Sequence, residues 1–392
     1  MPRRRMLHVT LALAAIVGFG LFILACTGWL SWSPDGSQIV FGYYDPNAGD
    51  KGEYRIALYD NGTGKVRALN PEILSVHEKG FLGQWKQDGS GLFVFATKSD
   101  QKLHVMDVSA STGEIIKEVE VPTRESDSQA IVAAVEMQGI LFINVGPLTR
   151  LDLATSEVTQ IDQDHSKGLF VFPLGDTRLF YLKTDDDLEG FGLGYVDPQT
   201  LALNPLFQIK NDDVRLRGSK GFRPLLAVEP GNSRIAISSM REKKDDIVIC
   251  NETGIQNVLS PKLPFSNFHI GNLQWSRDGK HLYASVINPL RDDFVQYSVA
   301  EIDAESGRAR VIPIAEVNTK GDSEFDEMFY LLLQVWVSPD QHTIATSTAN
   351  LQEGYIAEKD RALYLIDMSR QDQKVTKIPP PLLKKKDRKS VV

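Results

Sequence analysis

The chain has 392 residues, which is more than one ordinary compact core holds and indicates either several domains or a repeat architecture. Hydrophobic residues make up 42% of it and charged residues 24%, a composition typical of a folded globular protein that excludes bulk disorder. With 43 basic and 51 acidic residues the net charge is −8. Nucleic-acid-binding proteins need a basic face for the phosphates, so this balance argues against that class.

Residues 1–26 have the pattern of an export signal. Three arginines at positions 3–5 precede an almost wholly apolar run over residues 7–25. The run ends in Ile-Leu-Ala-Cys, which resembles a bacterial lipobox, and we therefore predict that Cys26 becomes the lipidated first residue of the mature protein. An uncleaved signal anchor and plain cleaved secretion are the alternatives. All three would place the chain from residue 27 onward on the exported side of the membrane of a bacterial cell envelope.

A turn motif recurs along the rest of the chain. Three copies have a tryptophan followed three and four residues later by Asp-Gly, and then by an apolar run at a fixed offset: Trp32, Asp35 and Gly36; Trp85, Asp88 and Gly89; Trp275, Asp278 and Gly279. Weaker copies begin at Val135, Phe172, Val228 and Val337. Asp-Gly accepts the positive φ that tight hairpin turns need. The apolar runs do not alternate with polar residues, which predicts strands that are covered on both faces.

A second marker recurs independently of the first. In each unit a later strand is predicted to end in Asp or Asn before a turn, at Asp60, Asp107, Asp152, Asp197, Asn251, Asp303 and Asp367. Each marker occurs seven times with a mean spacing of about 51 residues, which is typical of a repeat array. A unit of this length holds four short strands and has the size of one propeller blade.

We therefore predict an all-β, seven-bladed β-propeller over residues 27–380, followed by a basic, disordered tail over residues 381–392. Because the third unit is short and its turn is eroded, six and eight blades are the alternatives. The predicted blades are 27–80, 81–128, 129–167, 168–221, 222–268, 269–328 and 329–380.

The turns resemble those of TolB-type, WD-repeat-like β-propellers, whose hallmark is a W-S-P-D-G turn followed by an I-x-F-type strand. The resemblance covers about residues 29–378 and implies that the tryptophans and the turns are structural. Some propellers of this kind are oligogalacturonate lyases with a histidine-rich metal site. The resemblance therefore implies, as an alternative, a propeller enzyme whose site for a polysaccharide lyase or hydrolase reaction lies at the central mouth.

The sequence holds no local signature of catalysis or metal binding. It lacks a G-x-S-x-G elbow and an H-E-x-x-H pair, and no two histidines after residue 30 lie within six positions of each other. The run Asp185–Asp187 resembles the start of a calcium loop, but Val196 occupies the position of the closing glutamate. We therefore assign no catalytic residue, cofactor or metal. His104 is predicted to be a strand residue and Cys250 a small buried hydrophobe.

Acidic residues gather in the predicted connections between the second and third strands, which emerge opposite the Asp-Gly turns. We predict a polar partner-docking face there, with a mixed solvated rim as the alternative; its residues are Asp185, Asp186, Asp187, Asp245, Asp246, Asp292 and Asp293. The preferred function is a monomeric, non-catalytic scaffold that binds a protein or glycan partner in the envelope and contacts the membrane through its lipid or anchor. A small-ligand sensor would use the same mouth.

Overall fold

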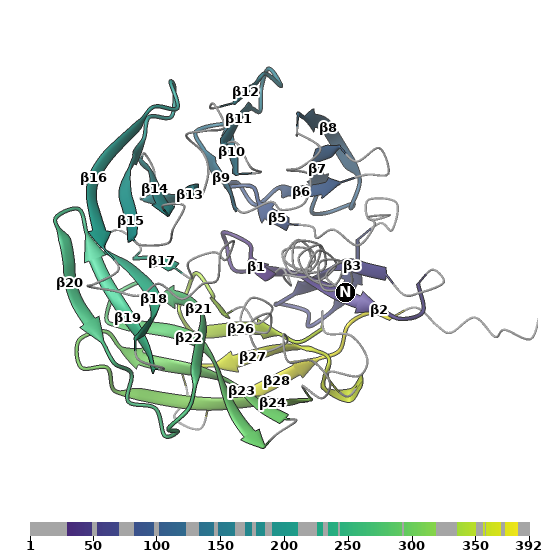
Figure 1. The fold of residues 1–392 in the computed structure, drawn as a ribbon. Helices are drawn as coiled ribbons and strands as arrows, with labels where there is room; N and C mark the ends of the chain where they lie inside the picture. Colours follow the sequence, from purple (N-terminus) through teal and green to yellow (C-terminus); the bar gives the residue numbers. More distant parts are fainter. Residues whose placement is uncertain are drawn as a thin grey trace, which may run out of the picture.

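The computed structural model describes most of the chain after residue 29. The described residues are 30–48, 53–69, 82–97, 102–122, 133–144, 148–160, 169–174, 178–184, 190–210, 226–229, 234–241, 244–291, 294–318, 335–349, 356, 358–369 and 373–382. They form seven four-stranded antiparallel sheets, each a meander in chain order, arranged around one centre (Figure 1). The predicted seven-bladed β-propeller is therefore confirmed.

Each blade takes four consecutive strands. Blade 1 holds β1 (Leu30–Trp32), β2 (Gln38–Asp45), β3 (Glu53–Asp60) and β4 (Val66–Ala68); blade 2 holds β5 (Leu82–Trp85), β6 (Gly91–Thr97), β7 (Leu103–Ser109) and β8 (Ile115–Val121). Blade 3 holds β9 (Ala133–Met137), β10 (Ile140–Asn144), β11 (Leu148–Asp152) and β12 (Val158–Gln160); blade 4 holds β13 (Leu169–Leu174), β14 (Arg178–Thr184), β15 (Gly190–Val196) and β16 (Leu203–Lys210).

The last three blades follow the same order. Blade 5 holds β17 (Leu226–Val228), β18 (Ile235–Arg241), β19 (Lys244–Asn251) and β20 (Gly254–Leu259); blade 6 holds β21 (His269–Trp275), β22 (His281–Arg291), β23 (Phe294–Asp303) and β24 (Ala309–Asn318). Blade 7 holds β25 (Val335–Val337), β26 (Thr343–Ser347), β27 (Leu363–Asp367) and β28 (Val375–Ile378). The only helical segment among the described residues is a 3-10 turn, η3 (Glu358–Asp360).

The second strand of each blade is apolar on successive residues because both of its faces pack against a neighbouring blade. In β2, Ile39, Val40 and Phe41 are each 0% exposed, although adjacent residues of a strand point to opposite faces. Val40 belongs to the apolar cluster between blades 1 and 2, whereas Ile39 and Phe41 belong to the cluster between blades 7 and 1. Each such side chain contributes about 1.5–3 kcal/mol when it is fully buried.

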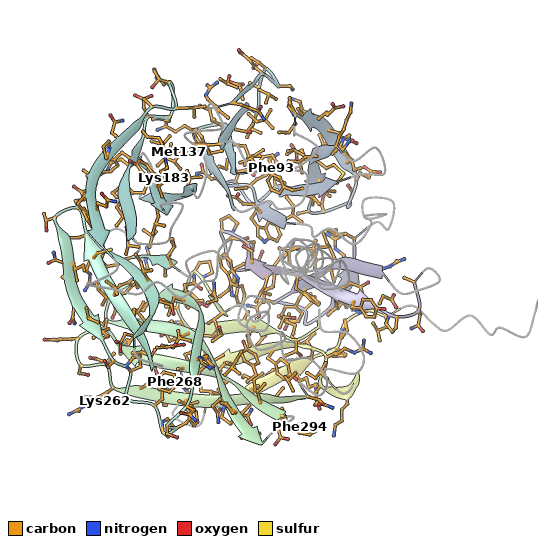
Figure 2. All side chains as sticks on the ribbon, viewed as in Figure 1. Phe93, Met137, Lys183, Lys262, Phe268 and Phe294 are labelled. Atoms are coloured by element: carbon orange, nitrogen blue, oxygen red, sulfur yellow. The ribbon has the colours of Figure 1, made fainter. Side chains whose placement is uncertain are left out.

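Seven apolar clusters hold the ring together, one at each interface between consecutive blades. Side chains fill the space between neighbouring sheets, for example around Phe93 of blade 2 and Met137 of blade 3 (Figure 2). A single blade cannot cover its own apolar faces, so neighbouring blades stabilise one another.

The ring closes by packing of blade 1 against blade 7, which lie side by side in Figure 1. The sheet of blade 7 contains only β25 to β28 and that of blade 1 only β1 to β4, so no described strand is exchanged between them. Leu30 and Trp32 pack with Ala345 and Leu363 across this interface. The backbone N–H of Tyr44 also donates to the Ala349 carbonyl at 3.0 Å.

The C-terminal segment differs from its prediction at its first two residues. Leu382 packs against the cluster between blades 7 and 1, and the Tyr43 hydroxyl donates to the Pro381 carbonyl at 3.3 Å. The predicted disordered tail therefore does not begin at residue 381, because an apolar surface of blade 1 holds the chain there. Residues 383–392 and the predicted signal over residues 1–26 lie outside the described residues. In the part of the chain that the structure describes, no helix is long and apolar enough to cross a membrane.

Candidate functional site

The three W-S-P-D-G-type turns are held by the carboxylate of their aspartate. In blade 1, Asp35 Oδ1 accepts from the Ser33 hydroxyl at 2.6 Å and from the Ser37 N–H at 3.0 Å. The hydrogen bond from the Ser33 side chain, with those from Ser37, lowers the pKa of Asp35 below its ordinary value of 3.8. Asp278 in blade 6 is bound in the same way by Ser276, at 2.8 Å. These carboxylates stabilise the turn.

Each of the three motif tryptophans connects its blade to the preceding one. The indole N–H of Trp85 donates to the Ser31 carbonyl at 3.2 Å, and that of Trp275 donates to the Ala227 carbonyl at 3.1 Å. Trp32 closes the ring by donating to the Trp336 carbonyl of blade 7 at 3.2 Å. Each acceptor lies in the first strand of the neighbouring blade, one residue before the position that corresponds to the motif tryptophan: Ser31 before Trp32, Ala227 before Val228, and Trp336 before Val337. The indole therefore satisfies a carbonyl at the inner edge of the neighbouring blade.

The weaker copy in blade 7 has the same backbone conformation at its turn as the three full copies, but with another residue. Gly36, Gly89 and Gly279 have φ values of +73°, +71° and +66°. In blade 7 the equivalent residue, Gln341, has φ +66°, and its Oε1 accepts from the Arg277 N–H of blade 6 at 2.7 Å.

Blade 3 lacks two residues at this turn because its first hairpin is tighter. Met137 pairs directly with Ile140, and the two residues between them, Gln138 and Gly139, have φ values of +53° and +76°. Two positive φ angles in a two-residue connection are characteristic of the type I′ hairpin turn. The eroded motif in the sequence is therefore a complete turn of another type.

The turns between the third and fourth strands confirm the second marker in six blades and correct it in blade 2. Asp60, Asp152, Asp197, Asn251, Asp303 and Asp367 each accept hydrogen bonds from backbone N–H groups two or three residues later. In blade 2 the hydroxyl of Ser109 caps the turn by accepting from the Thr112 N–H at 3.2 Å. Asp107 lies two residues earlier, inside β7, so its predicted place at a turn is wrong.

Two acids of the predicted docking face are buried in blade 5. Asp245 and Asp246 are 1% and 6% exposed and lie in β19, because the ladder with β18 continues to the Arg241–Lys244 pair. The prediction that these two acids belong to an exposed connection is wrong. Asp245 Oδ2 accepts from the Ile270 N–H of blade 6 at 2.5 Å, and Asp246 Oδ1 accepts from the Ser260 hydroxyl at 2.6 Å. Both carboxylates therefore satisfy donors of the fold.

The other predicted site residues of that face are not described by the structure. Asp185, Asp186 and Asp187 fall between β14 and β15, and Asp292 and Asp293 fall between β22 and β23; all five lie outside the described residues, as does Cys26. The polar docking face stays a prediction, and Asp245 and Asp246 present no exposed carboxylate to it.

Cys250 is fully buried in β19, as predicted, and burial raises the pKa of its thiol to about 12. His104 lies in β7, also as predicted, and its Nδ1 is 2.7 Å from Glu118 Oε1. His269 Nδ1 is 3.7 Å from Asp245 Oδ2. Among the residues for which the structure gives positions, no three His, Cys, Asp or Glu side chains come close enough together to hold a metal ion.

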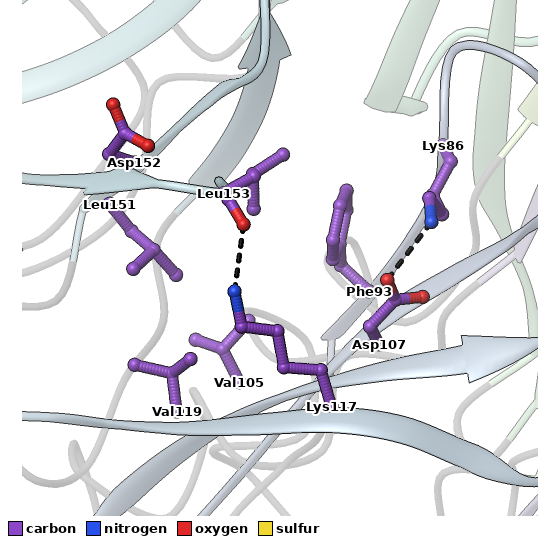
Figure 3. A pocket seen from close by; sticks show the side chains of 9 residues that line it. All are labelled: Lys86, Phe93, Val105, Asp107, Lys117, Val119, Leu151, Asp152 and Leu153. Atoms are coloured by element: carbon purple, nitrogen blue, oxygen red, sulfur yellow. Dashed lines mark hydrogen bonds and ion pairs between the residues drawn. The ribbon is translucent and has the colours of Figure 1, made fainter. Parts of the chain in front are cut away.

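A cavity of about 230 Å³ opens between blades 2 and 3, and we call it the blade 2–3 pocket (Figure 3). Its apolar lining comes from both blades: Phe93, Val105, Val119, Leu151 and Leu153. Phe93, Val105 and Leu151 are at most 3% exposed and belong to the apolar cluster of this interface. The floor of the pocket is therefore part of the rigid core between the two blades.

Charged side chains form the rim of the blade 2–3 pocket. Lys86 Nζ binds Asp107 Oδ2 at 2.9 Å, and Lys117 Nζ donates to the Leu153 carbonyl at 2.8 Å, which connects the rim across the interface (Figure 3). The ammonium group of Lys86 lies 5.8 Å from the Phe93 ring centroid. The second carboxylate oxygen of Asp107, Oδ1, is buried without a hydrogen-bond partner among the described residues.

Sequence reasoning missed this pocket, although blade 2 carried two signals of it. Lys86 occupies the position that Ser33 and Ser276 hold in the other two motif copies. Asp107 lies inside β7, two residues before Ser109, which caps the following turn. Both residues break a rule that other blades keep, and the fold brings them together as an ion pair on the pocket rim. Departures from local rules are typical of functional sites. The contribution of blade 3 could not be read from the sequence because it depends on how the blades pack.

Comparisons with known proteins support the fold and no finer identity. No family model matches the chain, and no curated protein is significantly similar to it in sequence. Hydrazine synthase from Kuenenia stuttgartiensis is 14% identical with a TM-score of 0.51, over 92% of this chain and 97% of that one. The Cps50 (Swd1) β-propeller domain from Myceliophteria thermophila is 11% identical with a TM-score of 0.51, over 82% and 93%.

A structure from a study of two prolyl endopeptidases is 12% identical with a TM-score of 0.52. The match covers 86% of this chain and 46% of that one. Structural neighbours thus include enzymes as well as a propeller domain studied by itself. At these identities the likeness shows the β-propeller fold alone.

Proposed function

We propose that this protein is a non-catalytic β-propeller that acts as a rigid scaffold and binds a partner protein through the blade 2–3 pocket. The observation that carries the proposal is the meeting of Lys86 and Asp107 at the rim of an apolar cavity. Concave apolar sites with a few placed polar groups are the usual form of a binding site.

The size and lining of the pocket support a protein partner over a glycan. At about 230 Å³ the cavity is smaller than the roughly 300–1,000 Å³ of sites for drug-sized ligands, so it suits a single inserted side chain. Its floor is aliphatic apart from the Phe93 ring, which suits an apolar side chain.

The proposed address is the bacterial cell envelope, with the propeller held at the membrane through Cys26. The arginines at positions 3–5, the apolar run 7–25 and the lipobox-like end support this address. The W-S-P-D-G-type turns support a relation to TolB-type propellers. Cys26→Ser should abolish incorporation of labelled lipid into the protein, and persistent labelling would contradict the lipid anchor without affecting the proposal for the pocket.

Site-specific photocrosslinking in intact cells tests the pocket. A photoreactive residue at Lys117, on the exposed rim, should capture one defined partner, and the same residue at Thr253, in an exposed turn of blade 5, should not. Val119→Glu introduces a charge into the apolar lining and should reduce capture at Lys117 about tenfold or more, because a charge buried without a partner is strongly unfavourable. Capture that is equal at both positions, or unchanged by Val119→Glu, would refute the proposal.

A further inference from the structure

Arg361 is a buried cation that has no counterion among the residues that the structure describes. It lies two residues before β27 in blade 7 and is 3% exposed. Its Nη1 is buried without a hydrogen-bond partner, and no ion pair to its guanidinium exists within the described part of the chain. Arginine stays protonated at every pH that a folded protein tolerates, so this charge cannot be relieved by loss of a proton.

The other buried charged groups of the described residues each have a partner. Glu229 is bound by Arg234, whose Nε donates to it at 2.7 Å. Asp245 and Asp246 accept from Ile270 and Ser260, as described above. A buried charge without a partner is strongly destabilising, and proteins normally pair it or neutralise it. Arg361 is therefore expected to meet an acceptor that does not belong to the described chain.

Arg361 lines an open cavity of about 530 Å³ together with Lys359, Pro379, Pro380 and Leu382. Both charged residues of this lining are cations, and Lys359 is exposed. This volume lies within the range of small-molecule sites.

Asp360, the acidic residue next to Arg361 in the sequence, forms its ion pair with another residue. The Asp360 carboxylate binds Lys377 Nζ at 2.8 Å, on the outer strand of blade 7. The backbone on either side of Arg361 is also held in place: the Thr348 hydroxyl donates to the Asp360 carbonyl at 2.6 Å, and the Ala362 N–H donates to the Thr348 hydroxyl at 3.2 Å. The base of the Arg361 side chain is therefore fixed in position at the wall of the cavity.

We propose that this cavity is a binding site for a small oxyanion, a carboxylate or phosphate group, with Arg361 as its main donor. An arginine guanidinium carries paired N–H groups in a planar fork that matches two oxygens of such a group. Lys359 adds a second positive charge, and Pro379 and Pro380 offer an apolar wall to the rest of the ligand molecule. The site belongs to blade 7 and is independent of the blade 2–3 pocket.

Titration calorimetry and thermal unfolding of the full chain test the proposal, with inorganic phosphate and acetate as separate probes against chloride at constant ionic strength. At least one probe should bind and raise the Tm of the wild-type protein. Arg361→Met keeps the side-chain length without the charge, and Arg361→Lys keeps the charge without the fork. Both should bind about 10- to 100-fold more weakly, the loss expected for one or two charge-assisted hydrogen bonds.

A variant with Lys384, Lys385 and Lys386 changed to Ser provides the matched control for diffuse positive charge, since these lysines follow the cavity residue Leu382 in the sequence. It should bind like the wild type. Binding of phosphate alone supports a phosphorylated ligand, and binding of acetate alone supports a carboxylate ligand. If each probe binds Arg361→Met as strongly as it binds the wild type and raises the Tm of both proteins equally, the proposal is overturned. An Arg361→Met protein that is more stable than wild type in every salt would overturn it as well, because the guanidinium would then be solvated by water only.

If Arg361→Met does not fold, Arg361→Lys and Lys359→Met carry the test. Lys359 is exposed, so its substitution should leave the fold intact while it weakens binding. Unchanged affinity in both variants would refute the assignment.

Discussion

Three glycines of the same motif should respond differently to substitution by alanine. Gly36, Gly89 and Gly279 share a φ between +66° and +73°, so alanine should lose about 1–2 kcal/mol at each from backbone strain alone. At Gly36 an added Cβ would lie 3.4 Å from the ring of Pro339, and at Gly89 it would lie 3.8 Å from that of Pro34, which are ordinary contacts. Strain alone should therefore set the loss at these two positions.

Gly279 lies against an ion pair whose carboxylate, that of Glu229, is buried. An added Cβ there would overlap the Glu229 carboxylate and stand 2.7 Å from Arg234 Nη2. The Glu229 side chain is 0% exposed and cannot move into water, and the same Arg234 nitrogen donates to the Gly279 carbonyl at 2.8 Å. Breaking a fully buried pair costs about 3–5 kcal/mol. The Arg234 side chain is 36% exposed, which reduces this loss, so the free energy of unfolding should fall by about 2 kcal/mol more for Gly279→Ala than for Gly36→Ala.

Urea unfolding of the three variants, followed by tryptophan fluorescence, measures this difference. The variants should rank with Gly36→Ala and Gly89→Ala close together and Gly279→Ala well below them. A Gly279→Ala loss within about 1 kcal/mol of the Gly36→Ala loss would refute the reasoning, because the Glu229–Arg234 pair would then adapt to the added methyl group without being broken.

Two further predictions concern the turns. Gln341→Gly relieves the strain of the positive φ but removes the hydrogen bond to the Arg277 N–H, so the free energy of unfolding should stay within about 1 kcal/mol of wild type. Gln341→Ala removes the same hydrogen bond and keeps the strain, so it should lose about 1 kcal/mol in urea unfolding. The pKa of Asp35 lies below its unfolded value of 3.8, so its stabilising contribution is complete above that pH and is lost as the pH falls through the folded pKa; the Tm of Asp35→Asn should therefore fall less on acidification than that of wild type.

Each of these outcomes can fail separately. Equal stability of Gln341→Gly and Gln341→Ala would show that the left-handed backbone at that position carries no strain. A steeper acid dependence of Tm in Asp35→Asn than in wild type would show that the hydrogen bonds to Asp35 do not stabilise the blade 1 turn.

The repeated local chemistry of the sequence was sufficient to predict the fold class and to favour seven blades over six or eight, and the structure confirms seven. Asp-Gly turns, apolar runs without alternation and the Asp or Asn before each later turn are local signals, and each acts within a few residues. The positive φ at Gly36 and the complete burial of Ile39, Val40 and Phe41 follow from them directly. Even the eroded turn of blade 3 kept enough signal to be counted, although its type I′ geometry was not foreseen.

The sites depended on how the blades pack. Asp245 looked like a loop residue because Lys and Asp surround it, yet the ladder of blade 5 extended far enough to bury it, and an N–H of blade 6 became its partner. The blade 2–3 pocket joins Asp107 to residues of the next blade, and the Arg361 cavity joins η3 to the chain after β28. The two walls of the blade 2–3 pocket meet only when the blades pack, because no single blade contains both of them, and the same holds for the two partners of the bond between Asp245 and Ile270. Local patterns therefore determined the blades, and only the packed ring determined which of their side chains face each other.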